Sequence, residues 1–168
     1  MESDIVINEP TTIRFMSTRS RIGILNQDES IESVYHHSDG YPEWLGVFLE
    51  KNYSDTSKVR ELMELGDISC IHSKTDWDMK EVEEPIIRTF NQRGEKTMAQ
   101  EHEDLNDYIF YDPIQIEYSY LWNTDLKEWK CYKAEFDYDW NIPKAPTVVD
   151  IPKTSRFFDY LTLSLCPN

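Results

Sequence analysis

The chain has 168 residues, of which 39% are hydrophobic, so it is long enough for one domain with a core and too apolar for a disordered chain. Its 32 acidic and 17 basic residues leave a formal net charge of −15, which argues against direct binding to nucleic-acid phosphates. No run of eighteen apolar residues occurs, so no membrane-spanning helix and no membrane partner are expected.

The cysteines and the first residues bear on the compartment. Cys70, Cys131 and Cys166 are far apart and show no CxxC or Cys/His spacing typical of a zinc site. Residues 1–10 lack the basic start and apolar core of a signal peptide. We therefore expect a reduced protein in the cytoplasm, with no metal and no other cofactor.

The first elements are an extension and a hairpin. Residues 1–15 are predicted to form an N-terminal extension, with an edge strand or loop around Pro10. Short β-type runs at residues 21–25 and 31–35 follow, separated by the polar stretch NQDES. This pattern predicts a β-hairpin with a short loop.

A corner, VYHHSDGYPEWLG, comes next at residues 34–46. Asp39-Gly40 is typical of a turn, and Pro42 suits the first position of a helix. A second helix is predicted from Asp55 or Thr56, either of which can cap it, to Gly66. The apolar stripe expected on the first helix consists of Trp44, Leu45, Phe48 and Leu49.

The second half is predicted to contain a further hairpin. DISCIH and PIIRTF read as short strands on either side of a charged loop, NQRGEK as a turn and AQEHEDLNDYIF as an acidic helix. IQIEYSYLWN and EWKCYKAEF alternate apolar and polar residues around TDLK, which predicts a hairpin. The proline-spaced stretch WNIPKAPTVVDIPK reads as a connector, and TSRFFDYLTLSL as a C-terminal helix.

Helices between hairpins predict the fold class. We expect an α+β fold, with a largely antiparallel sheet built from hairpins and packed with two to four helices. The predicted domain spans residues 16–140, after the extension at residues 1–15. Residues 141–168 then form the connector and the C-terminal helix.

Five motifs carry a resemblance to known proteins. MSTRSRIGIL, VYHHSDGYPEWLG, LEKNYSDTSKVRELMELGDIS, QRGE and IEYSYLWNTDLKEWKCYK occur in this order within residues 16–133. In these motifs the chain resembles a group of small uncharacterised proteins of tailed phages and bacteria, with a Ser-Thr-Arg-Ser start and a Tyr-x-His-x-Asp-Gly-Tyr-Pro corner. The resemblance implies a phage or mobile-element origin and an accessory role, without an established activity. Residues 1–15 and the tail after Lys133 depart from the group.

The corner at residues 34–46 has a possible chemical role as well as a structural one. His37 and Asp39 can supply two ligands of a metal site, or the base of a hydrolase. The simpler reading is a strand-to-helix turn, and the corner can also serve as a contact surface. Arg19, within Ser-Thr-Arg-Ser, and Arg93 can each hold an anion, although such stretches are more often a strand start or a turn.

The acidic residues are concentrated in one region. Residues 95–140 hold twelve acids and four bases, a net charge of −8, with aromatic residues between them. Carboxylates along a helix and a hairpin can imitate a phosphate backbone, with a solvated acidic face as the simpler reading. The candidate partner-binding residues are Glu101, Asp104, Asp107, Asp112, Glu117, Asp137, Tyr138, Asp139 and Trp140.

These patterns predict a phage-encoded, non-enzymatic protein in the host cytoplasm that binds a host protein with a basic surface. The concrete version is an acidic DNA mimic that inhibits a defence enzyme, such as an anti-CRISPR or anti-restriction protein. The alternative is a small metal-dependent or His/Asp-assisted hydrolase that uses His37 and Asp39. A third reading, a protein that sequesters a small molecule, requires a pocket that sequence does not reveal.

Overall fold

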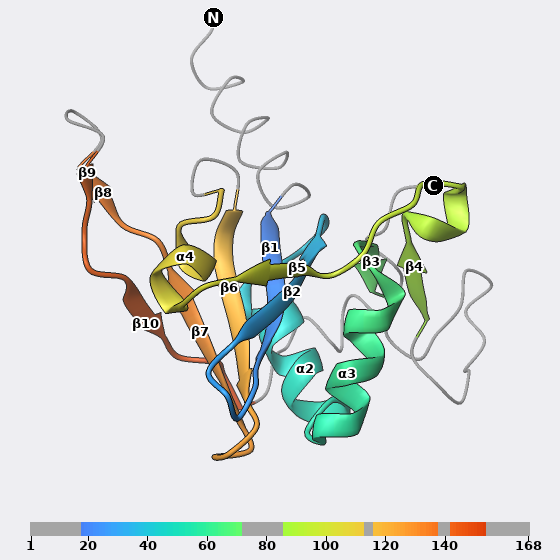
Figure 1. Ribbon diagram of the computed structural model, residues 1–168, viewed down its shortest axis with the longest axis horizontal. Helices are drawn as coiled ribbons and strands as arrows, with labels where there is room; N and C mark the ends of the chain where they lie inside the picture. Colours follow the sequence, from blue (N-terminus) through green and yellow to red (C-terminus); the bar gives the residue numbers. More distant parts are fainter. Residues whose placement is uncertain (1–17, 72–85, 113–115, 138–141, 154–168) are drawn as a thin grey trace, which may run out of the picture.

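The computed structural model describes residues 18–71, 86–112, 116–137 and 142–153 (Figure 1). The helical elements of these ranges are η1 (a π-helix, Pro42–Gly46), α2 (Val47–Asn52), α3 (Thr56–Leu65), η2 (a 3-10 helix, Asn91–Arg93) and α4 (Leu105–Ile109). The strands are β1 (Arg19–Leu25), β2 (Ile31–His36), β3 (Ile68–Ile71), β4 (Ile87–Thr89), β5 (Gln100–His102), β6 (Ile116–Asn123), β7 (Glu128–Lys133), β8 (Phe136–Asp137), β9 (Ile142–Pro143) and β10 (Thr147–Val149).

Eight of the strands form one mixed sheet. Its order is β10-β7-β6-β1-β2-β3-β4, and β5 pairs with β2 outside this path. The pairs β1–β6 and β2–β3 are parallel, and the other five pairs are antiparallel. The α+β class and a mostly antiparallel sheet are therefore confirmed. The parallel pairings are a departure, because hairpins produce only antiparallel neighbours.

Both predicted hairpins are present. β1 pairs with β2 from Ser20↔His36 to Leu25↔Ile31, and β6 pairs with β7 from Ser119 to Asn123. The parallel β1–β6 pairing joins the two hairpins edge to edge at the centre of the sheet. Four strands from two parts of the chain that are far apart in sequence thus lie side by side in one sheet.

The two helices after the corner are also confirmed. The first begins at Pro42 as predicted, but its first turn is the π-helix η1, which continues into α2. The side chain of Asp55 accepts a 2.7 Å hydrogen bond from the backbone N–H of Ser57 and so caps α3. Gly66 ends α3 with a φ of 76°, a conformation that favours glycine.

Two predictions in the second half are corrected. The expected acidic helix is formed only at Leu105–Ile109, because Gln100–His102 instead pairs as β5 with Ile31–Ser33 of β2. The expected connector contains β10, which pairs with β7 and adds a strand at that edge of the sheet. The predicted edge strand or loop around Pro10 and the predicted C-terminal helix lie outside the described residues.

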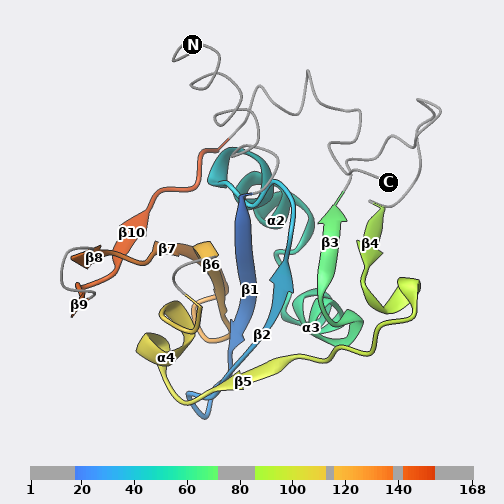
Figure 2. The ribbon, with the colours of Figure 1, turned by 90° about the horizontal axis from the view of Figure 1, so that it is seen from above.

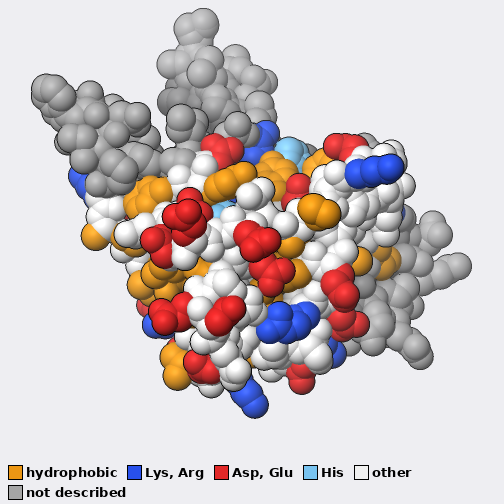
Figure 3. Space-filling view, viewed as in Figure 1, with side chains coloured by type: hydrophobic (Ala, Val, Ile, Leu, Met, Phe, Trp, Pro, Cys, Tyr) orange, Lys and Arg blue, Asp and Glu red, His pale blue; other side chains and the backbone are white. Residues whose placement is uncertain are grey.

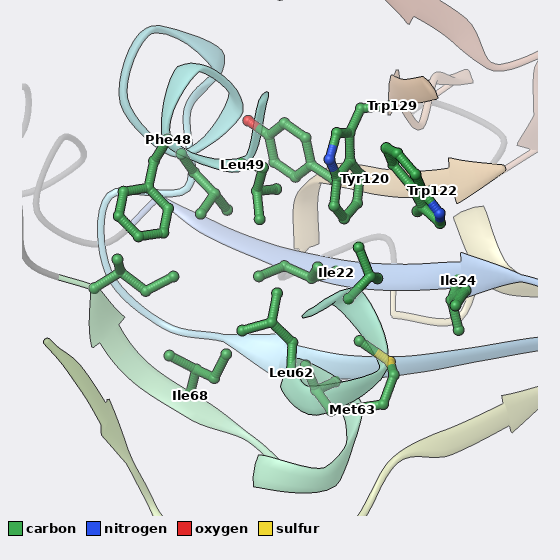
Figure 4. Packing of buried hydrophobic residues seen from close by; sticks show 14 of the residues in the cluster. Ile22, Ile24, Phe48, Leu49, Leu62, Met63, Ile68, Tyr120, Trp122 and Trp129 are labelled. Atoms are coloured by element: carbon green, nitrogen blue, oxygen red, sulfur yellow. The ribbon is translucent and has the colours of Figure 1, made fainter. Parts of the chain in front are cut away.

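The main core lies between one face of the sheet and the helices that follow the corner. Figure 4 shows Ile22 of β1 among the side chains of these helices and of β6. The aromatic end of this core includes Trp122 and Trp129, whose ring centroids are 5.5 Å apart. The labelled members are Ile22, Ile24, Phe48, Leu49, Leu62, Met63, Ile68, Tyr120, Trp122 and Trp129.

A smaller cluster covers part of the other face. Tyr108 and Ile109 of α4 pack against Ile31, Leu121 and Tyr132 of the sheet. The Tyr108 hydroxyl donates a 2.6 Å hydrogen bond to the Tyr120 carbonyl. Figures 1 and 2 place α4 on one side of β1 and β2 and α3 on the other. Helix α4 therefore fastens β5 and the acidic segment onto the sheet.

The cysteines differ from one another. Cys131 is free and buried, and burial raises the pKa of its thiol to about 12. Cys70 is disulfide-bonded, so the expectation of a fully reduced chain is wrong for Cys70. Among the helices of the described ranges, none is long and apolar enough to cross a membrane.

Candidate functional site

The corner after β2 is built around a buried histidine. His36 has no exposed surface, and its Nδ1 lies 3.2 Å from the hydroxyl of Ser20 on β1. Its Nε2 is buried without a hydrogen-bond partner. Burial, and to a smaller extent the neighbouring His37, lowers the pKa of His36 to about 3. His36 is therefore a neutral residue of the interior.

Asp39 occupies the tightest point of this corner. It has a φ of 58° and is 3% exposed, and burial raises the pKa of its carboxyl to about 7. The next residue must be glycine, because a Cβ on Gly40 would lie 2.5 Å from the Ser20 Oγ. A carboxyl with a pKa near neutrality suits a general acid or base. Whether Asp39 can act as one depends on whether His37 or other ligating side chains lie beside it.

The structure does not pair Asp39 with His37. The His37 Nδ1 lies 2.7 Å from the Tyr35 hydroxyl, and its ring packs beside Tyr35 and Phe90 at centroid distances of 5.9 and 6.2 Å. The pKa of Asp39 is raised by burial alone, without a contribution from the imidazole. In the ranges described, no group of three or more His, Cys, Asp or Glu side chains could hold a metal ion.

A second polar cluster, which the sequence motifs do not reveal, joins β1, β2, β5 and α4. Arg21 Nε donates a 2.8 Å hydrogen bond to the Ser33 hydroxyl, which lies 2.7 Å from His102 Nε2. His102 Nδ1 lies 3.5 Å from an Asp107 carboxylate oxygen, a contact too weak to count as a hydrogen bond. With Ser33 accepting from Arg21 and donating to Nε2, the His102 proton is on Nδ1.

The contacts run from Ser33 to His102 Nε2 and from His102 Nδ1 to Asp107, as the contacts of a serine-hydrolase triad do. In such a triad the serine is accessible and the aspartate is buried, and here the opposite holds. Ser33 has no exposed surface and His102 is 4% exposed, whereas the Asp107 side chain is 45% exposed. A substrate cannot reach the hydroxyl, and the Tyr111 ring stacks edge-on to His102 at 5.0 Å. The cluster is therefore a structural network that binds β5 and α4 to β2.

Replacing Ser33 by alanine tests this structural role. Arg21 and His102 would lose a shared buried partner, so we expect a loss of about 2 kcal/mol in the free energy of unfolding, measured by urea denaturation. The matched variant Ser54→Ala, at an exposed serine, should change stability by less than about 0.5 kcal/mol. The wild-type protein should not react with a fluorophosphonate probe, and labelling of Ser33 would show an accessible nucleophile instead.

An acidic groove lies at the end of the sheet beside α4. It has a volume of about 260 Å³ and lies between the β1–β2 loop, the start of α4 and the β6–β7 hairpin. Glu29, Glu103 and Asp104 form its acidic rim, and Lys130 is its one basic lining residue. The apolar and aromatic lining residues are Leu25, Ile31, Leu105, Leu121 and Tyr132. We call this feature the acidic groove.

Part of the predicted partner-binding set lies at or near this groove. Asp104 lines it, and Glu101 and Asp107 are exposed nearby on β5 and α4. Asp112, after α4, and Glu117, on β6, are half-buried. Of the remaining residues, only the backbone of Asp137 is described, in β8, and Tyr138, Asp139 and Trp140 lie outside the described residues.

Two of these acids also have structural roles. Asp104 caps α4 by accepting a 2.8 Å hydrogen bond from the Asp107 backbone N–H. Asp107 in turn accepts a 3.1 Å hydrogen bond from the backbone N–H of Glu103. Substitutions at Asp104 or Asp107 would therefore disturb α4 as well as the surface charge. Glu29 and Glu103 are exposed rim residues better suited to a test, and Glu29 carries no sequence signal beyond its place in a polar turn.

Acidic side chains also spread beyond the groove. Figure 3 shows Asp and Glu side chains across the face that carries α4 and β5, with hydrophobic side chains between them. Glu101 lies directly opposite Glu32 in the β2–β5 pairing, an arrangement of like charges that destabilises a sheet. This face therefore combines negative charge with apolar surface. No family model, curated protein or solved structure matches the chain.

Proposed function

We propose that this protein is a non-enzymatic interaction protein that binds a basic surface of a host protein through the acidic groove. The observation that supports this proposal is an apolar floor of Leu121 and Tyr132 beneath a rim of three carboxylates. Buried aromatic and aliphatic contacts supply affinity, and rim charges supply attraction and orientation. A Lys- or Arg-rich patch with an apolar centre is the chemistry that fits such a groove.

The biological setting of the proposal comes from the resemblance to phage proteins and from the net charge of −15. A host protein that grips nucleic acid uses Lys and Arg, so an acidic surface can compete for the same site. We therefore propose an inhibitor of a host nucleic-acid-handling or defence protein, acting in the host cytoplasm. The anti-CRISPR and anti-restriction versions are its most specific forms.

Affinity capture from a bacterial host lysate tests the proposal. We expect a basic, nucleic-acid-handling protein that is released by salt and displaced by DNA or RNA, because exposed charges lose their attraction as salt rises. Reversing two rim charges, Glu29→Lys with Glu103→Lys, should then weaken the affinity for that protein roughly tenfold or more.

The matched control is Glu61→Lys with Glu64→Lys on α3. Both glutamates are exposed, and the double reversal changes the net charge by the same amount on the other side of the sheet. This variant should retain most of the affinity. Equal losses in the two variants would mean that only net charge matters, and the absence of any salt-sensitive partner would overturn the proposal.

A further inference from the structure

A polar cavity lies at the same end of the sheet as the acidic groove, on the side that carries α3. It has a volume of about 530 Å³ and opens between the β1–β2 turn, the β6–β7 turn and the first turns of α3. Figure 1 shows these three segments together at the lower end of the molecule. The described lining residues are all polar, and none of them lines the acidic groove: Asn26, Gln27, Asp28, Thr56, Arg60 and Thr124. We call this feature the polar pocket.

Helix α3 supplies hydrogen-bond donors to the polar pocket. Thr56 and Arg60 are four residues apart in the helix, so their side chains lie on the same face. One Arg60 nitrogen donates a 2.8 Å hydrogen bond to the Asn26 amide oxygen, which holds the guanidinium in place and leaves its other N–H groups without a described acceptor. The Thr56 oxygen accepts a 2.9 Å hydrogen bond from the Trp122 indole N–H, so the hydroxyl keeps its own proton to donate. This wall therefore presents one positive charge and a hydroxyl donor.

The two turns supply hydrogen-bond acceptors. One Asp28 carboxylate oxygen accepts hydrogen bonds from the backbone N–H and the hydroxyl of Ser30, at 3.1 and 2.6 Å. Asp28 is exposed, and these bonds engage only one of its two carboxylate oxygens. The Thr124 hydroxyl donates a 2.9 Å hydrogen bond to the Leu25 carbonyl, so its oxygen is left to accept from a ligand. This wall therefore presents one negative charge and a hydroxyl acceptor.

The two charges of the pocket do not neutralise each other. In the part of the chain that the structure describes, neither Arg60 nor Asp28 forms a salt bridge. Opposite charges held in one cavity by different elements suit a ligand that carries both an anionic and a cationic group. A phosphate dianion suits the pocket less well, because its single guanidinium is balanced by a carboxylate. A nucleobase also suits it less well, because none of the described lining residues is an aromatic ring on which a base could stack.

We propose that the polar pocket binds a free α-amino acid. Arg60 and the Thr56 hydroxyl bind the ligand carboxylate, and Asp28 and the Thr124 oxygen bind its ammonium group. Gln27 supplies an exposed amide, which can donate to or accept from a polar side chain of the ligand. The volume falls within the range of small-molecule sites, roughly 300–1,000 Å³. The proposal does not depend on the acidic groove, because the two features share no described lining residue.

Calorimetric titration of the full chain at pH 7 tests the proposal with L-glutamine, L-glutamate and L-arginine, which share one zwitterionic head group. At least one of the three should bind. Two derivatives of the tightest binder then separate the charges, because its carboxamide lacks the carboxylate and its N-acetyl form lacks the ammonium group. Each derivative should bind roughly tenfold more weakly or worse. Failure of all three amino acids to bind, or equal binding of the parent and either derivative, would overturn the proposal.

Variants assign each charge of the ligand to a side chain. Arg60→Ala should weaken amino-acid binding about tenfold or more and should remove the difference between the amino acid and its carboxamide. The matched control is Lys58→Ala, which removes an exposed positive charge of α3 outside the pocket and should bind as the wild type does. Asp28→Asn should remove the difference between the amino acid and its N-acetyl form, and Asp125→Asn, in the neighbouring turn, should retain it. Equal losses in the pocket and control variants would mean that binding responds to overall charge, and would overturn the assignment.

Discussion

Replacing Asp39 by asparagine is expected to stabilise the protein at pH 8 by about 2–4 kcal/mol. The folded-state pKa of Asp39 is raised from 3.8 to about 7, so at pH 8 folding buries a carboxylate that has no described partner. Asparagine has the same shape, carries no charge and tolerates the φ of 58° at this position. Urea denaturation of both proteins at several pH values measures the difference.

The gain should depend on pH in a defined direction. A raised pKa gives stability that is fully present below the unfolded value of 3.8 and is lost as pH rises through about 7. The advantage of Asp39→Asn should therefore shrink as pH falls from 8 and disappear near pH 4. Asp125→Asn, at an exposed acid in the β6–β7 turn, is the control and should change stability by less than about 0.5 kcal/mol throughout. An equal gain at pH 8 and pH 4 would mean that amide packing, and not charge, is responsible.

His36 should act in the opposite direction. Its pKa is lowered from 6.5 to about 3, so between these pH values the unfolded chain takes up a proton that the folded chain does not. The contribution of His36 to stability should fall by about 1.4 kcal/mol per pH unit below pH 6.5, about 5 kcal/mol in all. In the wild type, as pH falls from about 6.5 to 4, the stability lost through His36 is partly offset by the stability gained through Asp39. The stability of Asp39→Asn should therefore fall more steeply with decreasing pH than that of the wild type.

His36→Leu checks the origin of this acid loss. Between pH 7 and pH 4, this variant should gain about 3 kcal/mol relative to the wild type, because it has no group to protonate. NMR of the wild-type imidazoles provides a test that needs no variant. The His36 ring should stay neutral at pH 4.5 while the protein is folded, and a protonated ring at that pH would contradict its burial.

Local signals in the sequence predicted local elements well. Asp55 and Gly66 mark the two ends of α3 because a cap and a left-handed glycine act through their immediate neighbours. Pro42 marks the start of η1 for the same reason. The β-branched residues of β10 were a further local signal, since valine and threonine favour strands, but the prolines around them indicated a connector.

The site depended on pairings that no local pattern encodes. The acidic groove exists because Ile31 pairs with His102, which brings the polar turn at Glu29 beside α4. Composition predicted the negative charge, but it could not distinguish exposed Glu103 from Asp104, whose carboxylate is committed to a helix cap.

The parallel pairing of β1 with β6 has a consequence for how the chain is made. Thr124 donates a hydrogen bond to the Leu25 carbonyl across 99 residues of sequence, so the centre of the sheet closes only when late-synthesised strands arrive. Contacts of such long sequence separation slow folding, because the loop between them must be ordered first. A nascent chain released before β6 would expose the open edge of β1, so the sheet is completed only after the β6–β7 hairpin has emerged.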